Sequence, residues 1–162
     1  MSGALRDSDF TAPTDDRYFE DYLVGAAHEY GYETISEAEI LAFGRLYDPQ
    51  PIHTDLEFAA KGPFDGLIAS GVHTMAILMR LYVTHYLSHA ASLASPGLDD
   101  LRWPRPVRPG DSLWLRATVQ EARRSQSKPD RGLVRTGIEL FNQHDNLVLT
   151  MVAINFLSLR NP

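Results

Sequence analysis

The sequence predicts a single α+β domain in which one long helix is followed by an antiparallel sheet. Residues 71–87 carry apolar side chains at helical spacing, which is typical of a long helix that packs on a core. Residues 113–119 and 134–140 alternate apolar and polar side chains, and residues 147–159 are apolar on both faces, as in strands. No repeat or linker interrupts this order, so one core is expected.

The first part of the chain is expected to form a strand and a helix. Residues 1–16 are polar without a clear period and predict a loose N-terminal segment, which leaves 17–162 as the domain. Residues 27–35 read as a strand. Ser36, with Glu39 three positions later, has the pattern of a helix N-cap with a capping box.

The helix that begins at Ser36 is expected to stop at Pro49, and a second short helix is expected over residues 54–60. In the long helix the apolar positions form a wide face, so we expect it to be nearly surrounded by other structure. That face comprises Val72, Met75, Ala76, Met79, Tyr82, Val83 and Tyr86.

Turn residues separate the expected strands. Pro109-Gly110 suits the middle of a type II turn, and residues 142–146 suit a hairpin loop. Residues 129–132 contain Pro, Asp and Gly and mark a turn between the strands predicted at 113–119 and 134–140. The doubly apolar segment 147–159 is expected to be a central strand or one at a subunit interface.

The composition excludes several classes of function. The formal net charge is −6, whereas a general nucleic-acid-binding protein carries a basic surface. The absence of cysteine excludes disulfides, thiolate nucleophiles and cysteine-ligated metals, and it fits a cytoplasmic protein. No run is apolar enough to span a bilayer, and the first residues lack the apolar stretch of a signal peptide, so no membrane association is expected.

Basic residues gather in one part of this acidic chain. Eight basic and three acidic residues lie between Arg102 and Arg131, a local charge of +5. Such a zone is suited to a small phosphorylated ligand. A solvated sheet face with scattered arginines has the same composition.

The segment Asp48-Pro49-Gln50-Pro51-Ile52-His53 is the strongest chemical signal in the chain. Its prolines oppose helical structure at the residues before them, so we expect neither a helix nor a flexible loop there. Fully extended, five steps would span roughly 17 Å, so Asp48 and His53 can share one small molecule only if the chain bends back. A carboxylate and an imidazole sharing a water are suited to acid/base catalysis near neutral pH. A proline-rich turn with His53 bonded to backbone explains the same residues equally well.

Three motifs together resemble the MaoC-like dehydratase and (R)-specific enoyl-CoA hydratase family, whose members have the hotdog fold. The first is the segment 48–53, followed by Asp55 and Ala59. The second is Ile68-Ala69-Ser70-Gly71 at the start of the long helix, and the third is the stretch 102–111 with Pro-Val-Arg-Pro-Gly-Asp. The resemblance covers residues 18–159. It departs from the family at Gln50, where Asn is usual, and at Ser70, where many relatives carry His.

The resemblance implies a fold and a site. The fold is an antiparallel sheet wrapped around one long central helix. Asp48 and His53 would be the catalytic pair, acting on one water during reversible hydration of a trans-2-enoyl thioester. Gly71 would supply an oxyanion-binding N–H at the helix start, with Ser70 and Gln50 as further substrate-binding residues. A glycine required for positive φ is the alternative for Gly71.

The resemblance also implies partners. The substrate would be an acyl-CoA thioester, with coenzyme A present only as part of the substrate and no separate cofactor or metal. A homodimer or higher homo-oligomer is expected, because hotdog proteins of this kind commonly pair through their sheets.

Other functions share the fold. A hotdog thioesterase commonly places a carboxylate on the long helix, and residues 71–87 contain no Asp or Glu. A non-catalytic acyl-thioester-binding subunit would not need both Asp48 and His53. His85 and His89 have the spacing of helical metal ligands but lack a third ligand nearby. His73 is either directed at the acyl group or hydrogen-bonded within the helix.

Overall fold

A computed structural model describes residues 10–162 and contains one antiparallel sheet and a group of helices. The sheet has five strands in the order β1-β3-β4-β5-β2, and every neighbouring pair is antiparallel. The strands are β1 (Ala27–Thr34), β2 (Ser92–Arg102), β3 (Ser112–Arg124), β4 (Arg131–Phe141) and β5 (Leu147–Ser158).

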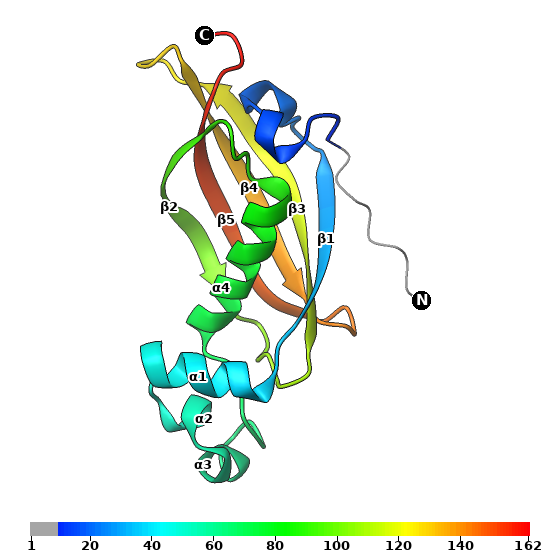
Figure 1. Cartoon of the computed structure of the whole chain (residues 1–162), viewed down its shortest axis with the longest axis vertical. Coiled ribbons are helices and arrows are strands. Elements are labelled where there is room, and N and C mark those ends of the chain that lie inside the picture. Colours follow the sequence, from blue (N-terminus) through cyan, green and yellow to red (C-terminus); the bar gives the residue numbers. More distant parts are fainter. Residues whose placement is uncertain (1–9) are drawn as a thin grey trace.

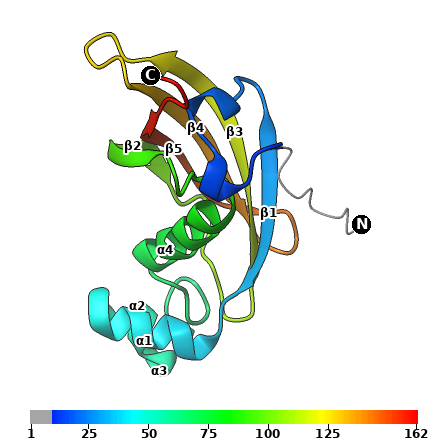
Figure 2. The same ribbon diagram turned by 45° about the horizontal axis from the view of Figure 1, so that its top comes forward.

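The sheet curves around one long helix, which confirms the predicted hotdog architecture (Figure 1). The helical elements are α1 (Glu37–Tyr47), α2 (Pro51–Thr54), α3 (Leu56–Ala60) and α4 (Gly71–Leu81), with 3-10 turns η1 (Thr14–Asp16) and η2 (Phe19–Asp21). A π-helical turn, η3 (Tyr82–Tyr86), continues α4. Figure 2 shows α4 against the concave face of the sheet, with α1, α2 and α3 gathered at one end.

Local signals explain where the first elements begin. The Ser36 hydroxyl accepts a hydrogen bond from the Glu39 N–H, and the Glu39 carboxylate accepts one from the Ser36 N–H, as a capping box requires. The connection between β3 and β2 includes the expected turn at Pro109-Gly110, where Gly110 has a φ of +86° that suits glycine.

The core lies between the sheet and one face of α4. Leu78, Leu81 and Tyr82 on the helical side are almost completely buried, as are Leu113, Leu115, Ile138, Leu140, Leu149 and Leu157 on the sheet. Along β4 the burial alternates strictly, which matches the predicted period. In β5 the outward residues are half-buried, so its second apolar face remains partly open to solvent.

The buried face of α4 differs from the predicted one. Thr74, Ile77, Leu78 and Leu81 are buried, whereas Val72, Met79 and Val83 are exposed, so the helix is not nearly surrounded. The prediction was wrong because apolar residues occur around most of the helix, and spacing alone could not show which of them meet the sheet.

Strand β2 was not predicted. It is an edge strand that pairs only with β5, its residues are mostly exposed, and its pairing register shifts three times. Its sequence therefore carries neither alternation nor a continuous apolar run, and Pro96 and Gly97 are tolerated because one side needs no partner.

The structure describes only part of the N-terminal segment that was expected to be loose. Residues 1–9 lie outside the described residues. Residues 10–16 contact the domain: Phe10 stacks on His28 with ring centroids 4.1 Å apart, and the Arg17 guanidinium lies 3.7 Å from its ring centroid. Phe10 is partly buried against the core, which the polar composition of the segment did not predict, and this contact attaches the segment to the fold.

Candidate active site

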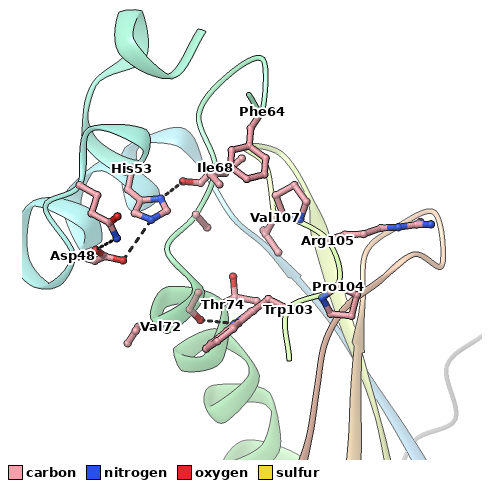
Figure 3. A pocket seen from close by; sticks show the side chains of 14 residues that line it. Asp48, His53, Phe64, Ile68, Val72, Thr74, Trp103, Pro104, Arg105 and Val107 are labelled. Atoms are coloured by element: carbon pink, nitrogen blue, oxygen red, sulfur yellow. Dashed lines mark hydrogen bonds and ion pairs between the residues drawn. The ribbon is translucent and has the colours of Figure 1, made fainter. Parts of the chain in front are cut away.

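The chain bends so that Asp48 and His53 converge, as the shared-site hypothesis requires. Asp48 is the C-cap of α1, and His53 lies in the single turn of α2. His53 Nε2 is 3.4 Å from Asp48 Oδ2 (Figure 3). The His53 side chain is buried and the Asp48 side chain is about one-fifth exposed. The Asp48 carboxylate is therefore the more accessible member of the pair.

Close packing of α1 and α2 produces the bend. A Cβ at Gly44 would lie 2.9 Å from the carbonyl oxygen of His53, so only glycine lets the two helices approach this far. Pro51 occupies the first position of α2, where its missing N–H is not needed. The expectation that residues 48–53 are not helical is thus wrong from Pro51 onward. A proline disfavours helical structure at the preceding residue, but it can itself be the first residue of a helix.

A backbone contact fixes the tautomer of His53. Its Nδ1 lies 2.8 Å from the carbonyl oxygen of Ile68, which can only accept a hydrogen bond, so Nδ1 carries the hydrogen. In the neutral ring Nε2 is then a proton acceptor, and it is this nitrogen that faces Asp48. Two neighbouring acceptors of this kind can share one donor that lies beside them in the cleft.

Two side chains hold the Asp48 carboxylate. The Ser70 hydroxyl donates to Oδ2 over 2.6 Å, and the Gln50 amide donates to Oδ1 over 2.7 Å. The hydrogen bond from Ser70, and after it the one from Gln50, holds the pKa of the Asp48 carboxyl below its usual range. Both residues, expected to bind substrate, thus contact the carboxylate directly.

Gly71 is the first residue of α4, where position alone leaves its N–H without a partner inside the helix. Its φ is not in the positive range, so a turn requirement does not explain the glycine. A Cβ at this position would lie 2.8 Å from Cε2 of Trp103, whose Nε1 donates to the Gly71 carbonyl oxygen over 3.0 Å. Glycine is needed because the indole packs against its Cα.

These residues line one cleft of about 430 Å³. Asp48 and His53 lie along one side, and the segment that follows β2 forms the opposite wall (Figure 3); Gln50 and Gly71 also line the cleft. The remaining lining residues are Phe64, Ile68, Ala69, Val72, Thr74, Trp103, Pro104, Arg105, Pro106 and Val107. The cleft is largely apolar; its polar lining side chains are Asp48, Gln50 and His53 together, with Thr74 and Arg105 apart from them.

Two wall residues were missed at the level of the sequence. Trp103 and Arg105 belong to the third motif, and Arg105 also to the basic zone, but neither residue was assigned to the site. The sequence signal for Trp103 was an aromatic residue next to a proline. Its contact with Gly71 joins residues 32 positions apart, so local pattern could not reveal it. His53 donates to the backbone carbonyl of Ile68, and a backbone acceptor cannot be recognised from the type of residue that carries it.

The other histidines lie outside this cleft. His85 stacks on Tyr30, and His89 Nε2 lies 2.7 Å from the Val83 carbonyl oxygen. His73 is buried and stacks on Phe43 in a separate hollow, with no partner for Nδ1 among residues 10–162. Within that same part of the chain, no group of three His, Asp or Glu side chains could hold a metal ion.

Comparisons with known proteins give one family. The model of the MaoC-like domain matches residues 25–139. A solved structure, titled as the MaoC-like dehydratase from Rhodospirillum rubrum, is 37% identical, has a TM-score of 0.83, and covers 90% of this chain and 99% of that one. The R-hydratase PhaJ1 from Pseudomonas aeruginosa is 27% identical with a TM-score of 0.69, covering 87% of this chain and 84% of that one.

Among curated proteins, 3-hydroxyacyl-thioester dehydratase Z from Mycobacterium tuberculosis is 41% identical over 82 residues. That match spans 49% of this chain and 54% of the mycobacterial protein, about half of each.

Proposed function

Because the chain belongs to the MaoC-like domain family, we propose that it is a hydro-lyase that reversibly hydrates trans-2-enoyl thioesters to (R)-3-hydroxyacyl thioesters. One observation carries the proposal: a carboxylate and an imidazole nitrogen, 3.4 Å apart, line the same largely apolar cleft as Gly71, the first residue of α4. The names of the dehydratase and R-hydratase relatives support the same class of reaction.

In this proposal the pair orients and activates one water. When the His53 ring is neutral, Nε2 and the Asp48 carboxylate both present acceptors, so a water bound in the cleft beside them donates one hydrogen to each and keeps an oxygen lone pair for attack. Asp48 acts as the base, and His53 orients the water and helps to return a proton. Ser70 and Gln50 keep the carboxylate ionised and fixed in position.

In the proposed hydration, the proton that Asp48 and His53 take from the water is returned to the substrate. The water oxygen bonds to the β-carbon, the C=C electrons move to the thioester carbonyl, and one water proton passes to the Asp48/His53 pair. The pair then gives a proton to the α-carbon, which completes the hydration. The N–H of Gly71, at the positive end of α4, would stabilise the negative charge on the carbonyl oxygen. Dehydration is the same path reversed.

The test is incubation with crotonyl-CoA, following loss of the enoyl absorbance and determining the configuration of the product. We expect 3-hydroxybutyryl-CoA of R configuration. Release of free thiol without hydration would indicate a thioesterase, and binding without turnover would indicate a non-catalytic subunit. Longer and branched enoyl-CoAs would then define the acyl range.

A change at Ser70 should move the acid limb of the pH profile. Asp48 must be deprotonated to act as a base, so activity falls as the pH drops through its pKa, which lies below the usual carboxyl range. Ser70→Ala removes the main cause of that shift, so the pKa rises and the limb of kcat/KM should move to higher pH.

The control for this experiment is Ser36→Ala, which also removes a helix N-cap but lies on the far end of α1 from Asp48. It should leave the limb in place. An unchanged limb in Ser70→Ala would mean that the limb does not report Asp48.

We also propose that the protein forms a homodimer. Val72, Ala76, Met79 and Val83 form an exposed stripe along α4 and its continuation η3, at spacings that place them on one helical face. An exposed apolar stripe of this kind is typical of an interface. Light scattering coupled to size-exclusion chromatography would show a single protomer mass if this is wrong.

A further inference from the structure

His73 is a buried histidine of α4 that the proposed reaction does not use. It lies in the first turn of the helix, close to Gly71, but it does not line the cleft. Its ring stacks on Phe43 of α1, with ring centroids 4.4 Å apart and ring planes 2° apart. Within residues 10–162 its Nδ1 has no hydrogen-bond partner, so the stack is the contact that explains the position of the ring.

The surroundings of His73 favour an uncharged ring. The ring borders a hollow of about 210 Å³ between α1, α4 and the end of β1. Burial lowers the pKa of His73, while Glu39 on α1 opposes this shift and Arg80 on α4 adds to it. Glu33 of β1 also lines the hollow, and its carboxylate pairs with Arg80. Protonation would place an N–H on Nδ1 without an acceptor, so the neutral ring stacks at lower cost.

The stack joins the two helices whose ends meet at the candidate pair. Helix α1 ends at its C-cap, Asp48, and α4 begins after its N-cap, Ser70. The Ser70 hydroxyl donates to Asp48 Oδ2 over 2.6 Å, so this hydrogen bond spans the junction of the two helices. Phe43 lies in the last two turns of α1 and His73 in the first turn of α4, so their stack is the aromatic contact next to that junction.

Core packing contributes little to the last turn of α1. Leu46 and Tyr47 there are 72% and 71% exposed. Gly44 sets this end of α1 against α2, because a Cβ on it would lie 2.9 Å from the His53 carbonyl oxygen. Phe43 sets the same end against α4. Adjacent residues of a helix point about 100° apart, so the two contacts hold α1 from different sides.

We infer that His73 is a positioning residue, whose stack with Phe43 holds Asp48 against the start of α4. The Ser70 hydroxyl then stays within hydrogen-bond distance of the carboxylate. The position of Asp48 matters to catalysis only if Asp48 is the base, so this role rests on the proposed function.

The test separates the flat ring of His73 from its volume and its nitrogens. His73→Leu fills a similar volume but cannot stack, so kcat for crotonyl-CoA hydration should fall by about 10- to 100-fold, as for a misplaced catalytic group. KM should stay near that of the wild type, because His73 does not line the cleft. The acid limb of kcat/KM should move to higher pH, since the hydrogen bond from Ser70 to Asp48 weakens.

His73→Phe keeps an aromatic stack without a ring nitrogen, and the adjacent hollow has room for the larger ring. It should restore both kcat and the position of the limb. Phe43→Leu is the reciprocal change and should lower kcat as His73→Leu does. The double variant of His73→Leu with Phe43→Leu should lose no more than either single variant, because each change removes the same contact.

His85→Leu is the matched control. His85 lies in η3, which continues α4, and stacks on Tyr30 with ring centroids 5.2 Å apart. This stack is at the other end of the helix from Asp48, so neither kcat nor the limb should change. Circular dichroism and thermal unfolding check that each variant is folded.

Three results would overturn the positioning role. A loss in His73→Phe as large as that in His73→Leu would mean that a ring nitrogen is required. Additive losses in the double variant would mean that His73 and Phe43 act separately. A raised KM with an unmoved acid limb would mean that His73 affects substrate binding.

NMR of the isotope-labelled Asp48 carboxyl carbon separates this role from the proposed function, because it needs no turnover. The pKa of Asp48 should be higher in His73→Leu than in the wild type, and unchanged in His85→Leu. If no enoyl thioester reacts but this difference is found, the hydratase proposal fails and the positioning of Asp48 stands. If enoyl thioesters react and the pKa of Asp48 is the same in His73→Leu and the wild type, the positioning role fails.

Discussion

Asp48→Asn should lower the turnover of crotonyl-CoA by about 10²- to 10⁴-fold, the range expected for loss of a positioned acid/base group. Asparagine keeps the shape of the side chain but cannot take a proton from water. It also has one oxygen where aspartate has two, so it cannot accept from both Ser70 and Gln50 as the carboxylate does. Steady-state kinetics with crotonyl-CoA measures the loss.

His53→Asn should have an effect of the same order. The asparagine amide can still donate toward the Ile68 carbonyl, so the buried acceptor keeps a donor, but it has no basic nitrogen to face Asp48. Circular dichroism and thermal unfolding would show whether the fold is retained. Loss of turnover in a folded variant is the expected result.

Asp55→Asn is the matched control for both variants. Asp55 belongs to the same motif, but its carboxylate caps α3 through the Phe58 N–H and does not line the cleft. Turnover should stay near that of the wild type. Undiminished turnover in Asp48→Asn or His53→Asn would reject the assigned pair.

The sequence predicts those parts of the fold that depend on neighbours in the chain. The capping box of Ser36 and Glu39 lies within one turn, and the alternation in β4 reflects a strand covered on one face by the core. The Asp48–His53 pair belongs to the same group, because a six-residue segment that contains two prolines allows few ways to bring the side chains together.

Contacts between distant residues could not be predicted from local pattern. The hydroxyl of Ser70 reaches Asp48 across 22 positions, so its role at the carboxylate depends on how α4 meets α1. The buried face of α4 depends in the same way on the position of the sheet. Strand β2 is formed by its pairing with β5 and carries little pattern of its own. The same kind of contact determines what a change at Gly71 would do.

Gly71→Ala should lower kcat for crotonyl-CoA hydration by about 10²- to 10³-fold, the loss typical of an impaired oxyanion donor. The added methyl would overlap the Trp103 indole, at 2.8 Å from Cε2, and displace the wall that adjoins the Gly71 amide. Alanine is a better helix former than glycine, so the propensity of α4 is not reduced. A thermal unfolding curve would show whether the overlap also affects stability.

A double-mutant cycle with Trp103→Ala identifies the cause of that loss. If the methyl acts by displacing the indole, Gly71→Ala should cost at least about tenfold less in the Trp103→Ala background, because the overlap is then absent. Trp103→Ala alone also removes the hydrogen bond to the Gly71 carbonyl and provides the baseline. Equal costs in the two backgrounds would contradict the steric explanation, and would mean that the methyl group obstructs the thioester itself.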